Sequence, residues 1–269
     1  MSAIQQNRIQ NSYRIGSRLL ALSLLFVLSG CQWVAESYLG LNMQPDMDEA
    51  DFTPGLNVFG ALKAGETLDT INCYFEIQEV KFLGSTFENL TVEDAEIELQ
   101  CTRTDGTLET YHLTHRENGL YMHSNLDINP GEHWVFTCTA DTFTVRSECV
   151  IPHTPMVQNV SLQSNGVQFE IGHDTTAFMY DVYLISGEKV QYNRVVALQA
   201  GNTPIQLKTT WTPAAGSTTL YVLAYDRQFE RYFSTSSLFF KPNAYRPPFT
   251  VVEGGYGVFG GISSAKVGL

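Results

Sequence analysis

The sequence predicts an all-β protein built from β-sandwiches, and three observations support this fold class. Apolar and polar residues alternate over many short segments, which places every second side chain on one buried face. Turn residues such as glycine, asparagine and proline separate these segments at intervals of about 8–12 residues. No segment of ten or more residues combines the periodicity of a helix with its capping residues. Short strands joined by turns at this spacing are typical of a sandwich.

The composition excludes two classes of protein. The chain has 269 residues, enough for one large domain or two of ordinary size. It is 43% hydrophobic and only 16% charged, whereas a disordered chain has low hydrophobicity and high charge. Acidic residues outnumber basic ones by 28 to 16, for a formal net charge of −12. Because phosphate recognition needs a clustered basic surface, we expect no nucleic-acid partner.

The first element is a lipoprotein signal peptide at residues 1–30. Three arginines precede an apolar run at residues 19–28, which is too short to cross about 30 Å of hydrocarbon as a helix. The run ends in the tetrapeptide LSGC at residues 28–31, which resembles the lipobox of bacterial lipoproteins. The resemblance implies a diacyl anchor of the palmitate type on the Cys31 thiol. The alternatives are an ordinary signal peptide with an incidental cysteine and an uncleaved anchor helix.

The second element is a lipidated tether at residues 31–50, which has neither a strand nor a helix periodicity. Removal of 30 of the 269 residues leaves a mature chain of 239, and the loss of three arginines moves the net charge from −12 to −15. Two acyl chains give a stable membrane attachment. Gln32 follows the lipidated cysteine, and the absence of aspartate there favours the outer membrane in enteric-type sorting. Whether the protein faces the periplasm or the exterior stays open.

The third element is a sandwich of the prealbumin or immunoglobulin-like type at residues 51–152. Residues 71–77 and 95–101 alternate strictly, so both segments present one apolar face. Asp105 and Gly106 form a hairpin turn signal. The remaining strands of this domain are expected at residues 108–113, 134–139 and 143–151.

The fourth element is a second sandwich at residues 153–247, which resembles a fibronectin type III-like module. A proline-rich entry is followed by an apolar Phe169, at a position where that family usually has tryptophan, and by an alternating run at residues 220–226. Its seven strands are expected at residues 157–162, 167–171, 178–185, 194–198, 205–210, 220–225 and 232–240.

The fifth element is a glycine-rich C-terminal segment at residues 248–269. Five glycines occur within residues 254–261, without the lysine and serine or threonine of a phosphate-binding loop. Because glycine permits close backbone approach, we favour a bulged strand or hairpin packed on a domain. The alternative is a docking segment for a membrane partner.

Four cysteines besides Cys31 share the apolar parity of their predicted strands. An even number of inward cysteines in an exported domain favours disulfides. We favour the pairs 73–101 and 138–149, with buried free thiols as the alternative. A zinc site is disfavoured because no two cysteines have the Cys-x₂-Cys spacing. The four residues are Cys73, Cys101, Cys138 and Cys149.

The sequence carries no catalytic constellation. The six histidines are scattered, and His112 and His115 lie on opposite faces of their strand, which disfavours a shared metal. No metalloprotease, nucleophile-elbow or phosphate-loop motif is present. We therefore expect no enzyme activity, no metal and no cofactor. Aromatic residues in the stretches 178–183 and 221–233 are expected mainly in the core, with a sugar-binding face as the alternative.

Four further segments resemble one family when they are taken in their order along the chain. Residues 52–60, 92–95, 149–152 and 253–260 are similar to the domain-of-unknown-function 4249 family of bacterial outer-membrane lipoproteins. This resemblance implies an accessory role beside TonB-dependent transporters and supplies no catalytic residues.

These observations lead to one functional expectation and one alternative. The expected protein is a non-enzymatic outer-membrane lipoprotein that acts as a binding or scaffolding accessory to a TonB-dependent transporter or another envelope complex. Its partners are then the membrane, through the lipid on Cys31, and a β-barrel transporter. The alternative is a surface carbohydrate-binding or adhesive module. The sequence does not identify a small-molecule ligand.

Overall fold

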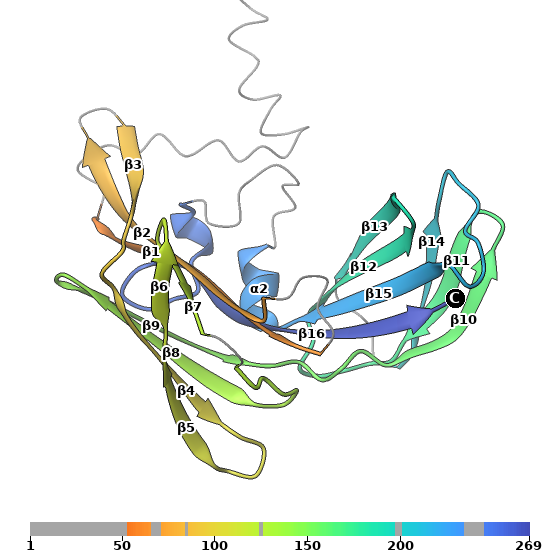
Figure 1. Ribbon diagram of the computed structural model, residues 1–269, viewed down its shortest axis with the longest axis horizontal. Coiled ribbons are helices and arrows are strands. Elements are labelled where there is room, and N and C mark those ends of the chain that lie inside the picture. The colour runs from red at the N-terminus through yellow and green to blue at the C-terminus, as the bar shows by residue number, and fades with distance from the viewer. Residues whose placement is uncertain (1–52, 66–70, 84–85, 124–125, 197–200, 234–244) are drawn as a thin grey trace, which may run out of the picture. The chain divides into compact units, whose positions relative to one another are not determined.

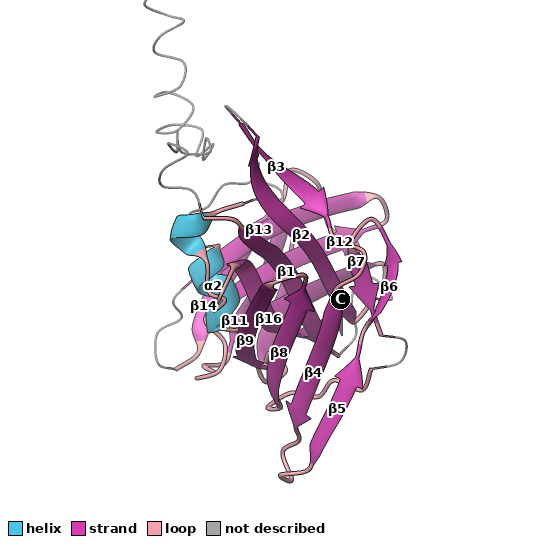
Figure 2. Cartoon of the chain, turned by 90° about the vertical axis from the view of Figure 1, so that its left-hand side faces the viewer, coloured by secondary structure: helices cyan, strands magenta, loops and turns pink. Residues whose placement is uncertain are grey.

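The computed structural model describes residues 53–65, 71–83, 86–123, 126–196, 201–233 and 245–269. Strands dominate this part of the chain (Figure 2), so the all-β sandwich expectation is confirmed. Its helical elements are the short helix α2 (Arg227–Tyr232) and the 3₁₀ turn η2 (Pro247–Phe249). None of the helices in the described part has the length and apolarity to cross a membrane. The predicted signal peptide, Cys31 and the tether lie outside the described residues.

One nine-stranded sheet runs through both predicted domains (Figure 1). Its central strand is β16 (Tyr256–Gly268), which pairs in parallel with β1 (Gly55–Ala64) through its first half and antiparallel with β15 (Thr218–Tyr225) through its second half. The order is β13-β12-β15-β16-β1-β2-β7-β6, with β3 also on β2. The other strands are β2 (Cys73–Leu83), β3 (Thr86–Thr91), β6 (Thr114–Glu117), β7 (Leu120–Met122), β12 (Met179–Ser186) and β13 (Lys189–Val196).

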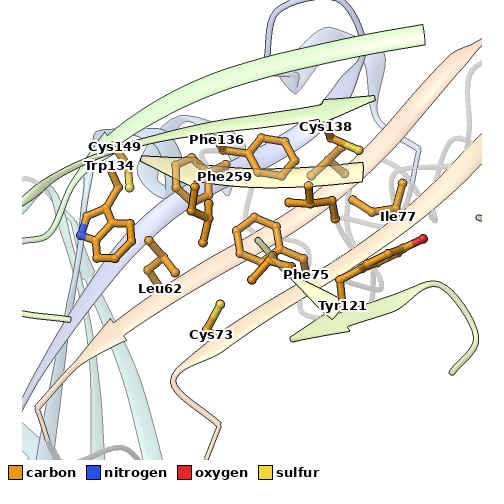
Figure 3. Close-up of a cluster of buried hydrophobic side chains, with 14 of the residues drawn as sticks. Leu62, Cys73, Phe75, Ile77, Tyr121, Trp134, Phe136, Cys138, Cys149 and Phe259 are labelled. Atoms are coloured by element: carbon orange, nitrogen blue, oxygen red, sulfur yellow. The ribbon is translucent and has the colours of Figure 1, made fainter. Parts of the chain in front are cut away.

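A four-stranded sheet packs on the N-terminal part of this large sheet and encloses the first core (Figure 3). Phe75 of the large sheet stacks on Phe136 of the small one at 5.0 Å between ring centroids, and on Phe259 of β16 at 5.6 Å. Apolar faces that close on each other in this way exclude water and stabilise the pair of sheets. The strand order is β5-β4-β8-β9, with β4 (Glu96–Thr102), β5 (Leu108–His112), β8 (His133–Ala140) and β9 (Phe143–Val150).

A three-stranded sheet packs against β12 and β15 and encloses the second core. Phe169 is fully buried there, which agrees with its assignment to the position where the fibronectin type III family usually has tryptophan. With β13-β12-β15-β16 opposite, the strand order agrees with the fibronectin type III-like expectation. The three strands are β10 (Val157–Gln163), β11 (Gly166–Ile171) and β14 (Thr203–Lys208).

The predicted strand at residues 232–240 is wrong at its start, because Tyr232 ends helix α2. Phe233 is the C-cap of this helix, and residues 234–240 lie outside the described residues. The strand beside β15 is instead β16, from the glycine-rich segment. The glycine-rich segment therefore forms a strand, β16. The sequence did not predict that this one strand takes part in both sandwiches.

Close packing on both faces explains the glycines of β16. Gly257 has a φ of +102°, and a Cβ there would lie 1.9 Å from the Val58 carbonyl oxygen. A Cβ at Gly260 would lie 2.6 Å from the Phe229 ring of α2 and 2.8 Å from Asp226 Oδ1. Real Cβ atoms do not approach so closely. Only glycine at these positions therefore allows β16 to pair closely with β1 and to pack against helix α2.

Candidate functional site

The candidate site is a pocket of about 510 Å³ on the face of the nine-stranded sheet that points away from the first core. Strand alternation builds it: Val58 and Leu62 of β1 point into the core, while Phe59 and Lys63 line the pocket. Residues from β1, β2, β12, β13, β15, β16 and α2 surround this space, which we call the aromatic pocket. A volume of this size falls within the range of small-molecule sites.

A continuous series of rings forms one wall of the aromatic pocket. Ring centroids are 6.1 Å apart between Tyr74 and Phe59, 6.0 Å between Phe59 and Phe229, and 5.8 Å between Phe229 and Phe233. Phe229 is buried at the centre of the series, whereas Phe59, Tyr74 and Phe233 are half-buried. Half-buried rings stabilise the wall and still offer a face to a bound molecule.

The far end of the pocket holds a buried ion pair. Asp181 is 2% exposed and accepts hydrogen bonds from Arg194 through both carboxylate oxygens, at 2.7 Å from Nε and 2.8 Å from Nη2. Tyr192 donates a third hydrogen bond to Oδ1 at 2.9 Å. Burial lowers the Arg194 pKa, but the hydrogen bonds and charge of Asp181 raise it above its usual value overall. Arg194 also lies over the Phe233 ring at 5.2 Å, so its guanidinium is held from two sides.

The near end of the pocket holds a second carboxylate. Glu76 accepts hydrogen bonds from the Tyr74 hydroxyl and the Gln78 amide, both at 2.9 Å. Burial, followed by the hydrogen bond and charge of Glu76, raises the Tyr74 pKa to about 12. Lys63 and Arg194 supply two positive charges, and Glu76 and Asp181 two negative ones, so the lining has no net formal charge.

Helix α2 is positioned by its N-cap. The Asp226 carboxylate accepts a hydrogen bond from the Phe229 backbone N–H at 3.0 Å, which satisfies one of the unpaired donors of the first turn. The four-residue spacing of Phe229 and Phe233 then places both rings on the face that walls the aromatic pocket. Glycine at position 260 lets this helix approach the sheet.

The buried carboxyl of Asp226 also lines a smaller cavity of about 310 Å³. Asp226 is 3% exposed, and its Oδ2 has no hydrogen-bond partner among the described residues. Burial raises the Asp226 pKa to about 7, against the opposing effect of the backbone N–H donors. The cavity wall also carries Cys149 and the pair His133–Glu148, whose Nε2 and Oε2 are 3.4 Å apart.

The four predicted inward cysteines are all buried, but they are free thiols rather than disulfides. In the β8–β9 register Cys138 lies opposite Val145 and Cys149 lies opposite Trp134. This offset of four residues separates the two cysteines by about 13 Å along the strands, and Figure 3 places them at opposite ends of the core cluster. A disulfide requires Cα atoms within about 7 Å, so the predicted 138–149 pair is wrong.

The predicted pair of Cys73 and Cys101 is also not formed, because both are free. Burial raises the pKa of Cys73, Cys101 and Cys138 to about 12. Thiols with such values stay protonated at neutral pH and lack nucleophilic character. The alternative weighed from the sequence, buried thiols that act as small apolar side chains, describes all four.

The described residues contain no group of three or more histidine, cysteine, aspartate or glutamate side chains arranged to hold a metal. His153 Nδ1 lies 3.1 Å from Asp174 Oδ1 at the entry to the second sandwich, where His153 is exposed and Asp174 is half-buried.

The two aromatic stretches noticed in the sequence contribute together to the pocket. Tyr183, Tyr225, Phe229 and Phe233 line it, whereas other rings of these stretches are core, as with Tyr180. Sequence reasoning missed the rings of the first sandwich and the ion pair. One signal was available for the ion pair: Asp181 is the only charged residue in the apolar run of β12.

No family model matches the chain, and no curated protein matches it. Among solved structures, a tetra-tandem repeat in the extending region of a large adhesion protein is 9% identical, with 80% of this chain and 49% of that chain covered and a TM-score of 0.24. The chain thus spans about half of that structure's length.

Two chicken proteins are also similar. The interferon gamma receptor alpha chain is 12% identical over 64% of this chain and 87% of its own, with a TM-score of 0.21. The FN1–FN3 domains of CNTN1 are 11% identical over 64% of this chain and 60% of theirs, with a TM-score of 0.25. Because all three TM-scores are far below 0.5, the fold assignment rests on the sheet topology described above.

Proposed function

We propose that this protein is a non-enzymatic, lipid-anchored binding module of the outer membrane. It serves as an accessory to a TonB-dependent transporter or another envelope complex, as the resemblance to the domain-of-unknown-function 4249 family suggests. The lipobox at residues 28–31 supports the anchor. The aromatic pocket carries the binding role, because it is a concave site with half-buried rings on a rigid sheet.

The chemistry of the pocket supports binding rather than catalysis. Both carboxylates that line it are already engaged, Asp181 by Arg194 and Tyr192, and Glu76 by Tyr74 and Gln78. The buried thiols of the first core are protonated at neutral pH and offer no nucleophile.

The direct test is a pull-down from detergent-solubilised envelope with the full-length protein as bait. We expect a β-barrel partner to be recovered, and the Cys31→Ala variant, which lacks the lipid, to recover much less of it. Metabolic labelling with a palmitate analogue should mark the parent chain and leave the variant unlabelled. Recovery of no barrel by a bait that is lipidated would contradict the accessory role.

The second candidate is a surface carbohydrate-binding or adhesive module. The observation in its favour is the set of half-buried rings in the pocket, since aromatic faces stack on sugar rings. Protease treatment of intact cells tests the second candidate. A surface module would be cleaved before lysis, so protection of the chain until lysis would contradict this candidate, whereas the pull-down tests the accessory role.

A further inference from the structure

We propose that the aromatic pocket binds a neutral oligosaccharide, which stacks on Tyr183 and receives hydrogen bonds from Arg194. This inference rests on the proposed binding function and specifies its ligand class. Three features of the pocket carry it: the half-buried ring of Tyr183, a fixed guanidinium with unused donors, and the cancelled charge of the lining.

The ring faces call for a ligand with an apolar surface. Tyr183 of β12 is half-buried and lines the pocket. Phe233 also lines the pocket, but its ring already contacts Arg194 and Phe229. A sugar ring presents axial C–H groups on one face and hydroxyls around its edge, so it can stack on an aromatic ring while its edge stays polar. Tyr and Phe side chains provide large contact areas for this at low conformational cost.

The guanidinium of Arg194 supplies the polar contact. Its Nε and Nη2 are engaged by Asp181, and its plane lies over Phe233, so its position is set before any ligand arrives. Its Nη1 makes no hydrogen bond with the described residues, which leaves two donors for the hydroxyls of a ligand. Preorganised donors increase affinity because less entropy is lost on binding. Asp181 and Tyr192 are therefore positioning residues for Arg194.

The charge of the lining selects against ionic ligands. Arg194 and Asp181 form an ion pair at one end, and Lys63 and Glu76 add one charge of each sign elsewhere in the lining, so the formal charges sum to zero. A lining with no net charge offers a polyanion or polycation no net attraction to offset the loss of its hydration. A neutral hydroxylated ligand meets donors and acceptors without this penalty.

The extent of the pocket favours several sugar units. Its lining runs from Tyr74 on β2 to Asp181 on β12, and β1, β16 and β15 lie between these strands. Four strand spacings correspond to about 19 Å. An elongated chain of sugars can contact both ends, whereas a single sugar cannot.

Isothermal titration calorimetry on the full-length lipidated protein, in a detergent without a sugar headgroup, tests the proposal. The probes are maltotetraose, cellotetraose, chitotetraose and mannotetraose, with tetragalacturonic acid as the charged counterpart. We expect at least one neutral tetrasaccharide to bind at one site per chain with a Kd below about 1 mM. The charged tetrasaccharide should bind at least about tenfold more weakly.

Matched variants assign the binding to the pocket. Tyr183→Ala and Arg194→Lys should each weaken binding by about tenfold. Tyr221→Ala is the control, because Tyr221 lies directly opposite Tyr183 on the neighbouring strand and is also half-buried, but does not line the pocket. It should bind as the parent does. A single cooperative unfolding transition well above the assay temperature confirms that each variant is folded.

The proposal is overturned if no neutral tetrasaccharide binds, if the charged one binds best, or if Tyr183→Ala and Tyr221→Ala behave alike. The envelope pull-down distinguishes this failure from failure of the proposed function. If the barrel partner is recovered but no saccharide binds, the ligand class is wrong and the accessory role stands. If saccharide binds but no barrel is recovered, the accessory role is wrong and the pocket assignment stands.

Discussion

The two faces of the nine-stranded sheet use the same strands for different purposes. On β2, Phe75 points into the first core and is fully buried, while its neighbour Tyr74 lines the aromatic pocket and is half-buried. On β12, Val182 belongs to the second core and Asp181 carries the buried ion pair of the pocket. Because side chains alternate, one strand can keep a closed core on one face and a binding surface on the other.

This comparison predicts that changes on the two faces differ in kind. A core residue contacts neighbours on every side, so its loss leaves a cavity. A pocket residue has one side without neighbours, so its loss removes fewer contacts and acts mainly on the ligand. Substitutions on the core face should therefore change mainly the stability of the protein, and substitutions on the pocket face mainly ligand binding.

The sharpest test compares two neighbours on β2. Phe75→Ala should lower the free energy of unfolding by about 3–5 kcal/mol, because it removes the stacking on Phe136 and Phe259 and leaves a cavity. Tyr74→Ala should lower it by less than about 1.5 kcal/mol but should weaken binding in the pocket. Urea denaturation measures both variants. Equal losses of stability would break the distinction between the faces.

The second test concerns Asp226, which lies where helix α2 meets the sheet. Burial raises its folded pKa to about 7, above about 3.9 in an unfolded chain. Between these values the folded state binds a proton that the unfolded state does not. The contribution of Asp226 to stability is therefore fully present below about pH 4 and is lost as the pH rises to about 7.

Asp226→Asn keeps an oxygen that can cap α2 and removes the titration. The variant should match the parent near pH 4 and be more stable at pH 8 by about 2–4 kcal/mol. Denaturation curves across this range measure the difference, and His133 and Glu148 in the same cavity are common to both chains. A constant difference between the two chains at every pH would show that Asp226 titrates normally.

The third test addresses the ion pair of the pocket face. Asp181→Ala removes the partner of Arg194 and should lower stability by about 1–3 kcal/mol, less than for a fully buried pair because the Arg194 side chain is 28% exposed. Arg194→Met in the same chain should recover part of this loss, since no guanidinium is then left without its carboxylate. A double-mutant cycle measures the coupling, and additive losses would mean that the two residues do not act as a pair.

The sequence predicted which face of each strand is buried better than it predicted which strands pair with one another. Alternation correctly placed Cys73, Phe75, Leu99 and Cys138 in the first core, because parity is a local property. It could not predict which strands are adjacent or in what register. The disulfide prediction failed for this reason: Cys138 and Cys149 face the same core, but the register puts them at different ends of it.

The aromatic pocket was predictable only in part, for the same physical reason. Its rings from the second sandwich stand in aromatic-rich stretches, whereas Phe59 and Tyr74 join them through the pairing of β16 with β1. A glycine-rich strand has little hydrophobic pattern, so its place in the middle of a sheet depends on tertiary contacts. Helix α2 was missed because its six residues are too few to show a helical period.

The smallest expected effect concerns the buried thiols of the core face. Because the four cysteines are free, a reducing agent should shift the unfolding midpoint by less than about 1 °C, whereas the loss of a disulfide would lower stability by about 2–5 kcal/mol. Thiol labelling should modify these residues only after unfolding, since burial excludes the reagent and raises the pKa of Cys73 and Cys138 to about 12. A drop of more than about 4 °C under reduction would mean that covalent links help to hold the core. Without such a drop, the core face is stabilised by packing alone, and its sulfur atoms act as small apolar groups between the sheets.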